Sequence, residues 1–336
     1  MNRLTLSFTT EKLMLAQPFR ISGYLFQSFD ALVVSLSDGD CQGRGEGGGV
    51  YYLNDDMPHM LLELEAARDA IESGLTREEL RSVMKPGGAR NAVDCALWDL
   101  EAAQTGMPVW ELAGQTAPVA LRTTFTIGAD EPSAMARVAR SYVQARAIKV
   151  KLTGHLELDL ARVRAIRAAR EDVWLGVDGN QGFAFSEMGP LVDGLLEQGV
   201  ALLEQPLARG QESKLDGYRS SIAIAGDESI LSLVDVPFAA GRFDVVNIKL
   251  DKCGGLTEGL MMAAEARKLG LSVMVGNMGG SSLAMAPSFV LGQGCDIVDL
   301  DGPIFLAQDR QPGVAYIDGN VWSGPEVWGR GSKVTA

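Results

Sequence analysis

The sequence predicts an α/β protein in which an α+β N-terminal domain precedes a (β/α)₈ barrel. Over residues 1–115, strand-like runs come first and helical segments follow, which is typical of a compact α+β domain. Over residues 116–312, short apolar strands alternate with amphipathic helices, as a closed barrel requires. We expect the C-terminal segment, 313–336, to form a hairpin at Asp318-Gly319 and to pack back on the first domain.

The elements of the first domain follow from periodicity and turn residues. Alternating apolar and polar residues predict strands at 3–8 and within 31–46, where Asp38-Gly39 supplies a hairpin turn. Three helical segments follow, and Gly106 ends the last of them. These predicted helices span 57–74, 76–84 and 89–106.

Eight candidate strands recur at regular intervals in the second domain, with helix-like segments such as 157–170 and 256–270 between them. This repeat favours a closed barrel, and an open doubly wound sheet is the alternative architecture. The candidate strands lie at 121–127, 145–152, 173–178, 200–205, 221–227, 243–250, 271–277 and 295–301.

Composition excludes several classes of protein. The chain has 43 acidic against 30 basic residues and a net charge of −13, which argues against a nucleic-acid partner and suits a metal or cationic ligand. The first 19 residues lack the apolar core of a signal peptide, and no run approaches the ~20 apolar residues of a membrane span. We therefore expect a cytoplasmic protein that acts on a small molecule without a membrane partner. Self-association into a homo-oligomer is left open.

Histidine is scarce, which narrows the chemistry. His59 and His155 are the only two in the chain. A Ser-His-Asp hydrolase or a site with several histidine ligands would have to be built from this pair, so the sequence disfavours both.

Three carboxylates stand at the ends of consecutive predicted strands: Asp178 in "GVDGN", Glu204 in "LLEQP" and Asp227 in "AGDES". In a barrel the C-terminal strand ends share one mouth, where active sites lie. Without a cation these groups would repel one another, and carboxylate oxygens are the ligands of a hard dication such as Mg²⁺. A helix cap is the alternative role for any single acid.

Lysines occupy neighbouring strand ends. Lys149 and Lys151 of "IKVKL" point to one face, and Lys249 of "NIKLDK" would lie across the mouth from Lys151. A cationic neighbour and a nearby metal favour the neutral amine of Lys151, which can then act as a base. Bases on both sides of a substrate carbon suit removal of a proton α to a carboxylate and its return to the other face. We expect Lys252 to lie in a loop.

The eighth strand ends in "DLDGP", where Asp299 and Asp301 share a face. Two acids on one face concentrate negative charge. They suit a substrate ammonium group.

Together these residues resemble the enolase superfamily, in its muconate-lactonizing subgroup, and more specifically the dipeptide epimerases. The resemblance spans nearly the whole chain and also includes the helix "RNAVDCALWDLEA". It implies a modified barrel with an α+β capping domain, Mg²⁺ as the cofactor, and a dipeptide epimerised at its C-terminal residue. The implied metal ligands are Asp178, Glu204 and Asp227, the implied acid/base residues are Lys151 and Lys249 beside Lys149, and the implied ammonium ligands are Asp299 and Asp301.

Specificity in this family lies in the capping loops, and here the sequence departs from relatives that act on Ala-Glu. Those carry an arginine soon after a "PF" element, whereas this chain reads "PFRISGYLFQSFD", with Arg20 too close to the strand to substitute. We expect Tyr24, Phe26 and Tyr51 to contact the substrate and to favour an apolar or aromatic side chain. Packing at the domain interface is the alternative role for these rings.

Other functions share parts of this pattern. The same lysines and metal serve N-acylamino acid racemases and o-succinylbenzoate synthases, but the D-x-D favours a substrate with a free amino group. "GRGEGG" at 43–48 matches a nucleotide-binding motif, but a hairpin precedes it and "VYYLNDD" follows it in place of a helix. A noncatalytic metal-dependent binding protein is the alternative from another class.

Overall fold

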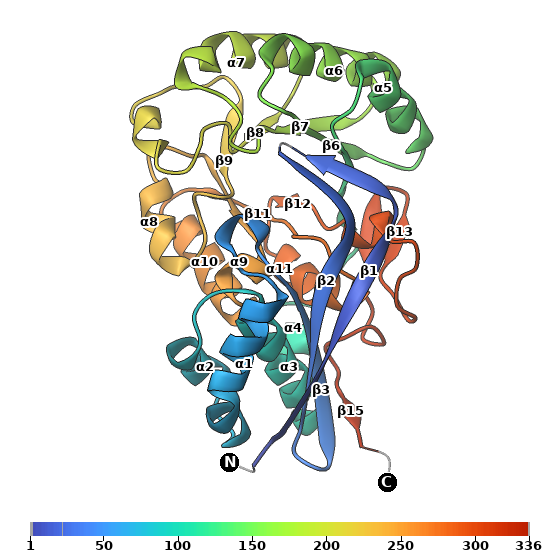
Figure 1. The fold of residues 1–336 in the computed structure, drawn as a ribbon, viewed down its shortest axis with the longest axis vertical. Helices are drawn as coiled ribbons and strands as arrows, with labels where there is room; N and C mark the ends of the chain where they lie inside the picture. Colours follow the sequence, from blue (N-terminus) through green and yellow to red (C-terminus); the bar gives the residue numbers. More distant parts are fainter. Residues whose placement is uncertain (1–2, 22, 335–336) are drawn as a thin grey trace.

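The computed structural model describes residues 3–21 and 23–334, and its centre is a nearly closed barrel of eight parallel strands (Figure 1). Each strand lies inside one of the eight predicted segments, so the barrel prediction is confirmed and the open sheet is wrong. The strands are β5 (Thr124–Ile127), β6 (Ala147–Lys151), β7 (Trp174–Asp178), β8 (Leu202–Glu204), β9 (Ala223–Gly226), β10 (Val245–Ile248), β11 (Ser272–Val275) and β12 (Ile297–Val298).

Helices surround the barrel, and buried apolar side chains such as Ile148, Val163 and Leu175 fill the space between the two layers. The outer helices are α5 (Pro132–Ser141), α6 (Leu156–Ala169), α7 (Met188–Glu197), α8 (Val236–Ala239), α10 (Leu256–Lys268) and α11 (Ser282–Gly292), and α9 (Leu250–Cys253) is a single turn. Short 3₁₀ turns are η2 (Phe185–Glu187), η3 (Glu212–Leu215), η4 (Leu233–Asp235) and η5 (Gly302–Phe305). No helix among the described residues is long and apolar enough to cross a bilayer.

The N-terminal part pairs β1 (Thr5–Ile21), β2 (Tyr24–Ser37) and β3 (Cys41–Gly48) in an antiparallel sheet. The tip of the long β1–β2 hairpin extends over the barrel (Figure 1). The turn predicted at Asp38-Gly39 joins β2 to β3, and Gly39 adopts a φ of 100° there. The helices of this part are α1 (Met57–Glu72), α2 (Arg77–Val83), α3 (Gly88–Thr105) and α4 (Val109–Leu112), with η1 (Tyr51–Leu53) between β3 and α1.

The C-terminal segment divides between a small three-stranded sheet and the N-terminal sheet. Its predicted hairpin, β13 (Ala315–Ile317) and β14 (Asn320–Trp322), pairs with β4 (Leu121–Arg122) beside the barrel. The residues after the hairpin return to the first domain: Trp328 Nε1 donates to Arg44 O of β3 at 2.8 Å, and β15 (Ser332–Lys333) pairs with β3.

The glycines of "GRGEGG" have a packing role. Gly43, Gly45 and Gly47 alternate along β3 and face α3, so closely that a Cβ on any of them would lie 2.1 Å from a backbone atom of that helix. Because β3 belongs to an antiparallel sheet and leads into the 3₁₀ turn η1, the nucleotide-binding reading is wrong. This glycine stripe, Gly43, Gly45 and Gly47, lets the backbones of α3 and β3 pack directly against each other.

This packing predicts a steep cost for one added methyl group. Gly45→Ala places a Cβ 2.1 Å from the carbonyl oxygen of Ala92, and should lower the free energy of unfolding by about 1–3 kcal/mol or more in urea denaturation. Gly48→Ala is the matched control, because its nearest neighbour is 3.9 Å away. Equal stability of the two variants would contradict the packing argument.

Candidate active site

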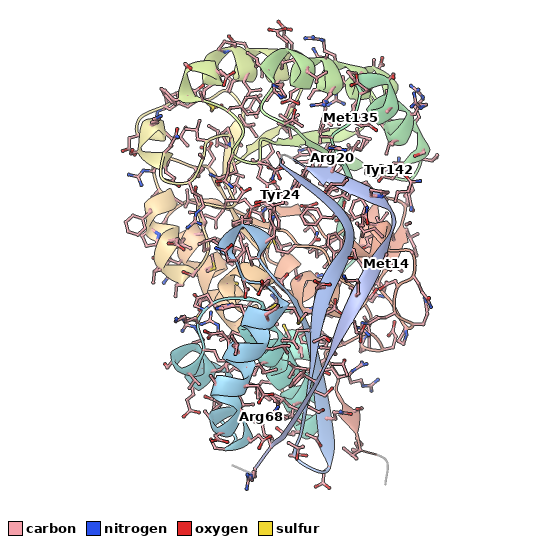
Figure 2. All side chains as sticks on the ribbon, viewed as in Figure 1. Met14, Arg20, Tyr24, Arg68, Met135 and Tyr142 are labelled. Atoms are coloured by element: carbon pink, nitrogen blue, oxygen red, sulfur yellow. The ribbon has the colours of Figure 1, made fainter. Side chains whose placement is uncertain are left out.

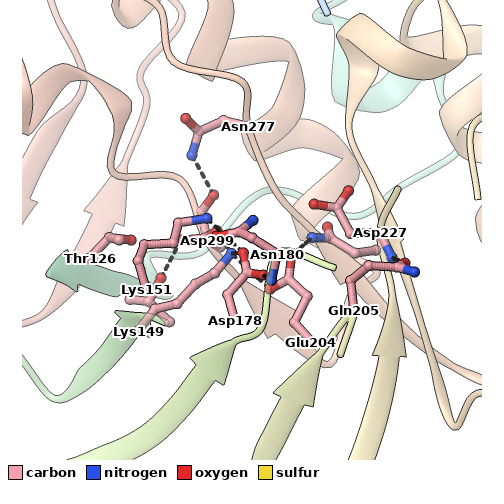
Figure 3. A network of polar contacts seen from close by, with 12 residues as sticks. Thr126, Lys149, Lys151, Asp178, Asn180, Glu204, Gln205, Asp227, Asn277 and Asp299 are labelled. Carbon is pink, nitrogen blue, oxygen red and sulfur yellow. Dashed lines mark hydrogen bonds and ion pairs between the residues drawn. The ribbon is translucent and has the colours of Figure 1, made fainter. Parts of the chain in front are cut away.

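Three carboxylates meet at the C-terminal mouth of the barrel (Figure 3). Asp178 and Glu204 end β7 and β8 and are paired in register, and Asp227 directly follows β9. One oxygen from each lies within 4.8 Å of the others, and all three side chains are buried. The parallel register of three adjacent strands therefore assembles the acidic set that the sequence predicts.

The electrostatics of this acidic trio, Asp178, Glu204 and Asp227, suit a bound cation. Burial, with the charges of Asp178 and Asp227, raises the pKa of Glu204 to about 7. Burial also raises the pKa of Asp227, but Lys249 and Lys252 outweigh it and the net shift is downward. Glu204 thus lacks enough positive charge around it. An oxygen-binding dication between the three groups would supply that charge.

Lysines flank the trio on both sides. The Nζ of Lys151 lies 2.6 Å from Asp178 Oδ2, and the Nζ of Lys249 lies 2.6 Å from Asp227 Oδ2. The two lysines come from β6 and from the end of β10, with the three acidic strands between them. A lysine amine therefore stands at each end of the acidic row.

Lys149 is buried behind this row. Its Nζ donates to Asp299 Oδ2 at 2.7 Å and lies 2.8 Å from Glu204 Oε2, an ion pair without hydrogen-bond geometry. Burial lowers the pKa of Lys149, but Asp299, Glu204 and Asp178 outweigh it and hold the pKa well above its usual value. Lys149 is thus a fixed positive charge that links the acidic trio to the eighth strand.

The two acids of "DLDGP" differ in how much of their charge is compensated. Asp299 accepts hydrogen bonds from Lys149 and from the Thr124 hydroxyl, whereas Asp301 Oδ2 accepts the Thr126 N–H at 2.6 Å. Burial, together with the charge of Asp299, raises the pKa of Asp301 to about 7. Asp301 is therefore the acid of this pair whose negative charge no cationic side chain among the described residues balances.

Sequence reasoning missed two charged residues of the mouth. Lys252 does not lie in a loop: it is buried in α9 and donates to the Asp227 carboxylate and carbonyl at 2.5 Å each. Its position three residues after Lys249, before Gly254-Gly255, was the available signal, because one helical turn places both amines on one side.

The other missed residue is Glu228, which follows Asp227 in "GDES". It is 2% exposed, and its Oε2 has no hydrogen-bond partner among the described residues. Burial and the charges of Asp227 and Asp178 raise its pKa to about 8. Adjacency to a predicted ligand was the only hint in the sequence.

Aromatic rings cover the mouth. Tyr51 of η1 contacts Tyr24 and Phe26 of β2, with ring centroids 4.5 and 5.2 Å apart, and Tyr52 and Phe29 extend this cluster. Below the rings is a cavity of about 70 Å³. The predicted site residues that line it are Phe26, Tyr51, Lys149, Lys151, Asp227, Lys249, Asp299 and Asp301. Asp178 and Glu204 lie buried beneath it, and Tyr24 packs on its cover.

Two family models match the chain. "Mandelate racemase / muconate lactonizing enzyme, N-terminal domain" matches residues 4–114, and "Enolase C-terminal domain-like" matches residues 134–301. The matched regions together span most of the N-terminal part and most of the barrel.

Relatives of named activity match almost end to end. An L-Ala-D/L-Glu epimerase of Escherichia coli is 36% identical over 306 residues, 90% of this chain and 95% of its own. A hydrophobic dipeptide epimerase of Roseobacter litoralis is 32% identical over 317 residues, 90% of this chain and 91% of its own.

Solved structures agree with this similarity. An enolase family member from Agrobacterium tumefaciens with homology to dipeptide epimerases, bound to sodium and L-Ala-L-Glu, superposes with a TM-score of 0.92 at 39% identity, covering 97% of this chain and 100% of that one. A dipeptide epimerase from Enterococcus faecalis, complexed with Mg and L-Leu-L-Tyr, has a TM-score of 0.91 at 27% identity, covering 98% and 99%.

The charge imbalance predicts a dissociable cation at the acidic trio. With MgCl₂ present at about 100 times its Kd, the free energy of unfolding of the wild type should rise by about 2.7 kcal/mol. Glu204→Gln should be at least as stable as the wild type without the salt, because it removes a buried repulsive charge, and should gain nothing from it. Asp216→Asn, at an exposed carboxylate on the surface, is the control that keeps the gain. An equal gain in Glu204→Gln would overturn the site.

Proposed function

This chain belongs to the mandelate racemase/muconate lactonizing enzyme family of the enolase superfamily, and on that premise we propose that it is a Mg²⁺-dependent dipeptide epimerase. The reaction moves the α-proton of the C-terminal residue from one face of its carbon to the other. The observation that carries the proposal is the symmetric placement of Lys151 and Lys249 at the two ends of the acidic trio.

Mg²⁺ would be held by Asp178, Glu204 and Asp227, and when bound it supplies positive charge that stabilises the enediolate of the substrate. The lysines move the protons. A neutral amine at one lysine takes the α-proton, which breaks the C–H bond. The ammonium group at the other lysine donates a proton to the opposite face, and the new C–H bond has the inverted configuration.

The surroundings of Lys249 suit the role of donor. Burial lowers its pKa, but Asp227 and the other carboxylates of the mouth outweigh burial, and the net shift is upward. Lys249 is therefore an ammonium group near neutral pH. When the bound stereoisomer is the one that Lys151 deprotonates, Lys249 can donate the proton to the opposite face of the carbon.

Asp299 and Asp301 would bind the α-ammonium group of the dipeptide. Because Lys149 and Thr124 already compensate Asp299, we assign the larger share of this charge recognition to Asp301. A buried acid without a cation is costly. An N-acylated amino acid or a succinylbenzoate precursor brings no ammonium group to this end, which favours a dipeptide over either.

For the side chain that is epimerised, we propose an apolar or aromatic residue. Tyr24, Phe26 and Tyr51 form the cover of the cavity, and among the described residues no arginine lines it. Arg20 lies on the opposite face of β1 from Phe19 and Ile21, which both line the cavity. The buried Glu228 side chain, which also lines the cavity, offers no positive charge to an acidic side chain.

Removal of either lysine tests the two-base reaction. Lys151→Ala and Lys249→Ala should each lower kcat for epimerisation by about 10²–10⁴-fold or more, because one proton transfer loses its acid or base. Each variant should still exchange the α-proton of one stereoisomer with D₂O, and the two variants should act on opposite stereoisomers. Both should keep the stabilisation by MgCl₂. Undiminished epimerisation in either variant would contradict the mechanism.

Side-chain preference is tested by paired substrates. The kcat/KM of the wild type should be at least about 10-fold higher for L-Ala-L-Phe than for L-Ala-L-Glu, because an acidic side chain finds aromatic rings in place of an arginine. Comparable values for the two dipeptides would count against an apolar subsite, while leaving the epimerase reaction itself intact.

A further inference from the structure

A large groove lies next to the small catalytic cavity. It measures about 680 Å³, within the ~300–1,000 Å³ of typical ligand sites, whereas the cavity measures about 70 Å³. The groove runs between β1, the loop after β5, and α5, where Figure 2 shows Arg20, Met135 and Tyr142 near one another. Three residues line both spaces: Phe19, Thr126 and Phe305.

Two of these shared residues, Phe19 and Phe305, form a wall between the groove and the cavity. The rings of Phe19 and Phe305 pack with their centroids 4.8 Å apart. Backbone hydrogen bonds hold both flanks: Ala129 N–H donates to Arg20 O at 3.0 Å, and Ala307 N–H donates to Met14 O at 2.8 Å. The aromatic cover opposite has exposed members such as Tyr24, which is 45% exposed. The main chain on both flanks of the wall is thus tied to neighbouring segments, whereas the cover includes an exposed ring.

The wall stands at the ammonium end of the cavity. Asp301 is the residue that precedes η5, and Phe305 ends that same turn. Thr126 donates its N–H to Asp301, and its carbonyl accepts the hydroxyl of Tyr142, which lines the groove. A carbon whose ammonium group is bound to Asp301 thus lies beside the partition between the two spaces.

We propose that the Phe19–Phe305 pair limits the N-terminal residue of the substrate to a small side chain, and that the groove behind it accepts a larger one once Phe305 is truncated. The inference rests on the proposed function, because it takes Asp301 as the ligand of the ammonium group. It assigns the pair to selection of the N-terminal residue. The reaction at the C-terminal residue is left to the lysines.

The test compares N-terminal residues at a constant C-terminal residue. For L-Ala-L-Phe against L-Leu-L-Phe, and for L-Ala-L-Glu against L-Leu-L-Glu, Phe305→Ala should raise the leucine-to-alanine ratio of kcat/KM by about 10-fold or more over the wild type. Because one pair has an apolar C-terminal residue and the other an acidic one, the result is independent of the preference at that position. Phe19→Leu, a milder change in the same wall, should raise the ratio by a smaller factor and serves if Phe305→Ala fails to fold.

Met278→Ala is the matched control, because Met278 lines the same cavity from the β11 side and does not line the groove. Its leucine-to-alanine ratio should stay at the wild-type value. A ratio unchanged in both wall variants, or raised in Met278→Ala instead, would overturn the inference. Failure of the wild type to exchange the α-proton of any of the four dipeptides would instead overturn the proposed function.

Discussion

The balance of buried charge at the barrel mouth is the constraint on which the site depends. Six carboxylates and four lysines are gathered there, and all of them are buried or nearly so. Their formal charges leave two negative charges uncompensated, which is the charge of one divalent cation. The carboxylates are Asp178, Glu204, Asp227, Glu228, Asp299 and Asp301, and the lysines are Lys149, Lys151, Lys249 and Lys252. Burying so many charges is tolerable only because eight of the ten groups contact one of opposite sign, the exceptions being Glu228 and Asp301.

The N-terminal part of the chain holds this mouth in shape. The glycine stripe of β3 brings α3 close enough for Asn91 to donate to Asp251 at 2.8 Å, and Gly48 N–H donates to the same carboxylate at 2.8 Å. Asp251 lies in α9, between Lys249 and Lys252 in the sequence, and both of these lysines contact Asp227. A second link joins Glu46 of β3 to Ser281, at the start of α11, and to Arg310. Packing of the sheet is thereby coupled to the position of the proton donor.

Much of this arrangement was predictable from the sequence, because it depends on local signals. Apolar strands at regular spacing give the barrel, and a charged side chain at the carboxyl end of a strand is favoured to face the mouth rather than the apolar layer under the helices, so the trio and the lysines follow from their positions. Features set by tertiary contact were not predictable. Lys252 needed the single turn α9 to become buried, the β13–β14 hairpin joined β4, and the Phe19–Phe305 wall pairs residues from opposite ends of the chain.

The most direct test of the account is incubation of the wild type with MgCl₂ and a pool of L,L-dipeptides in D₂O, followed by mass spectrometry and chiral analysis of the C-terminal residue. The account predicts dipeptides whose C-terminal residue is inverted and carries one deuterium at its α-carbon, because the donor on the second face has exchanged with solvent. Absence of both deuterium and inversion in every dipeptide, with the cation shown to be bound, would contradict it.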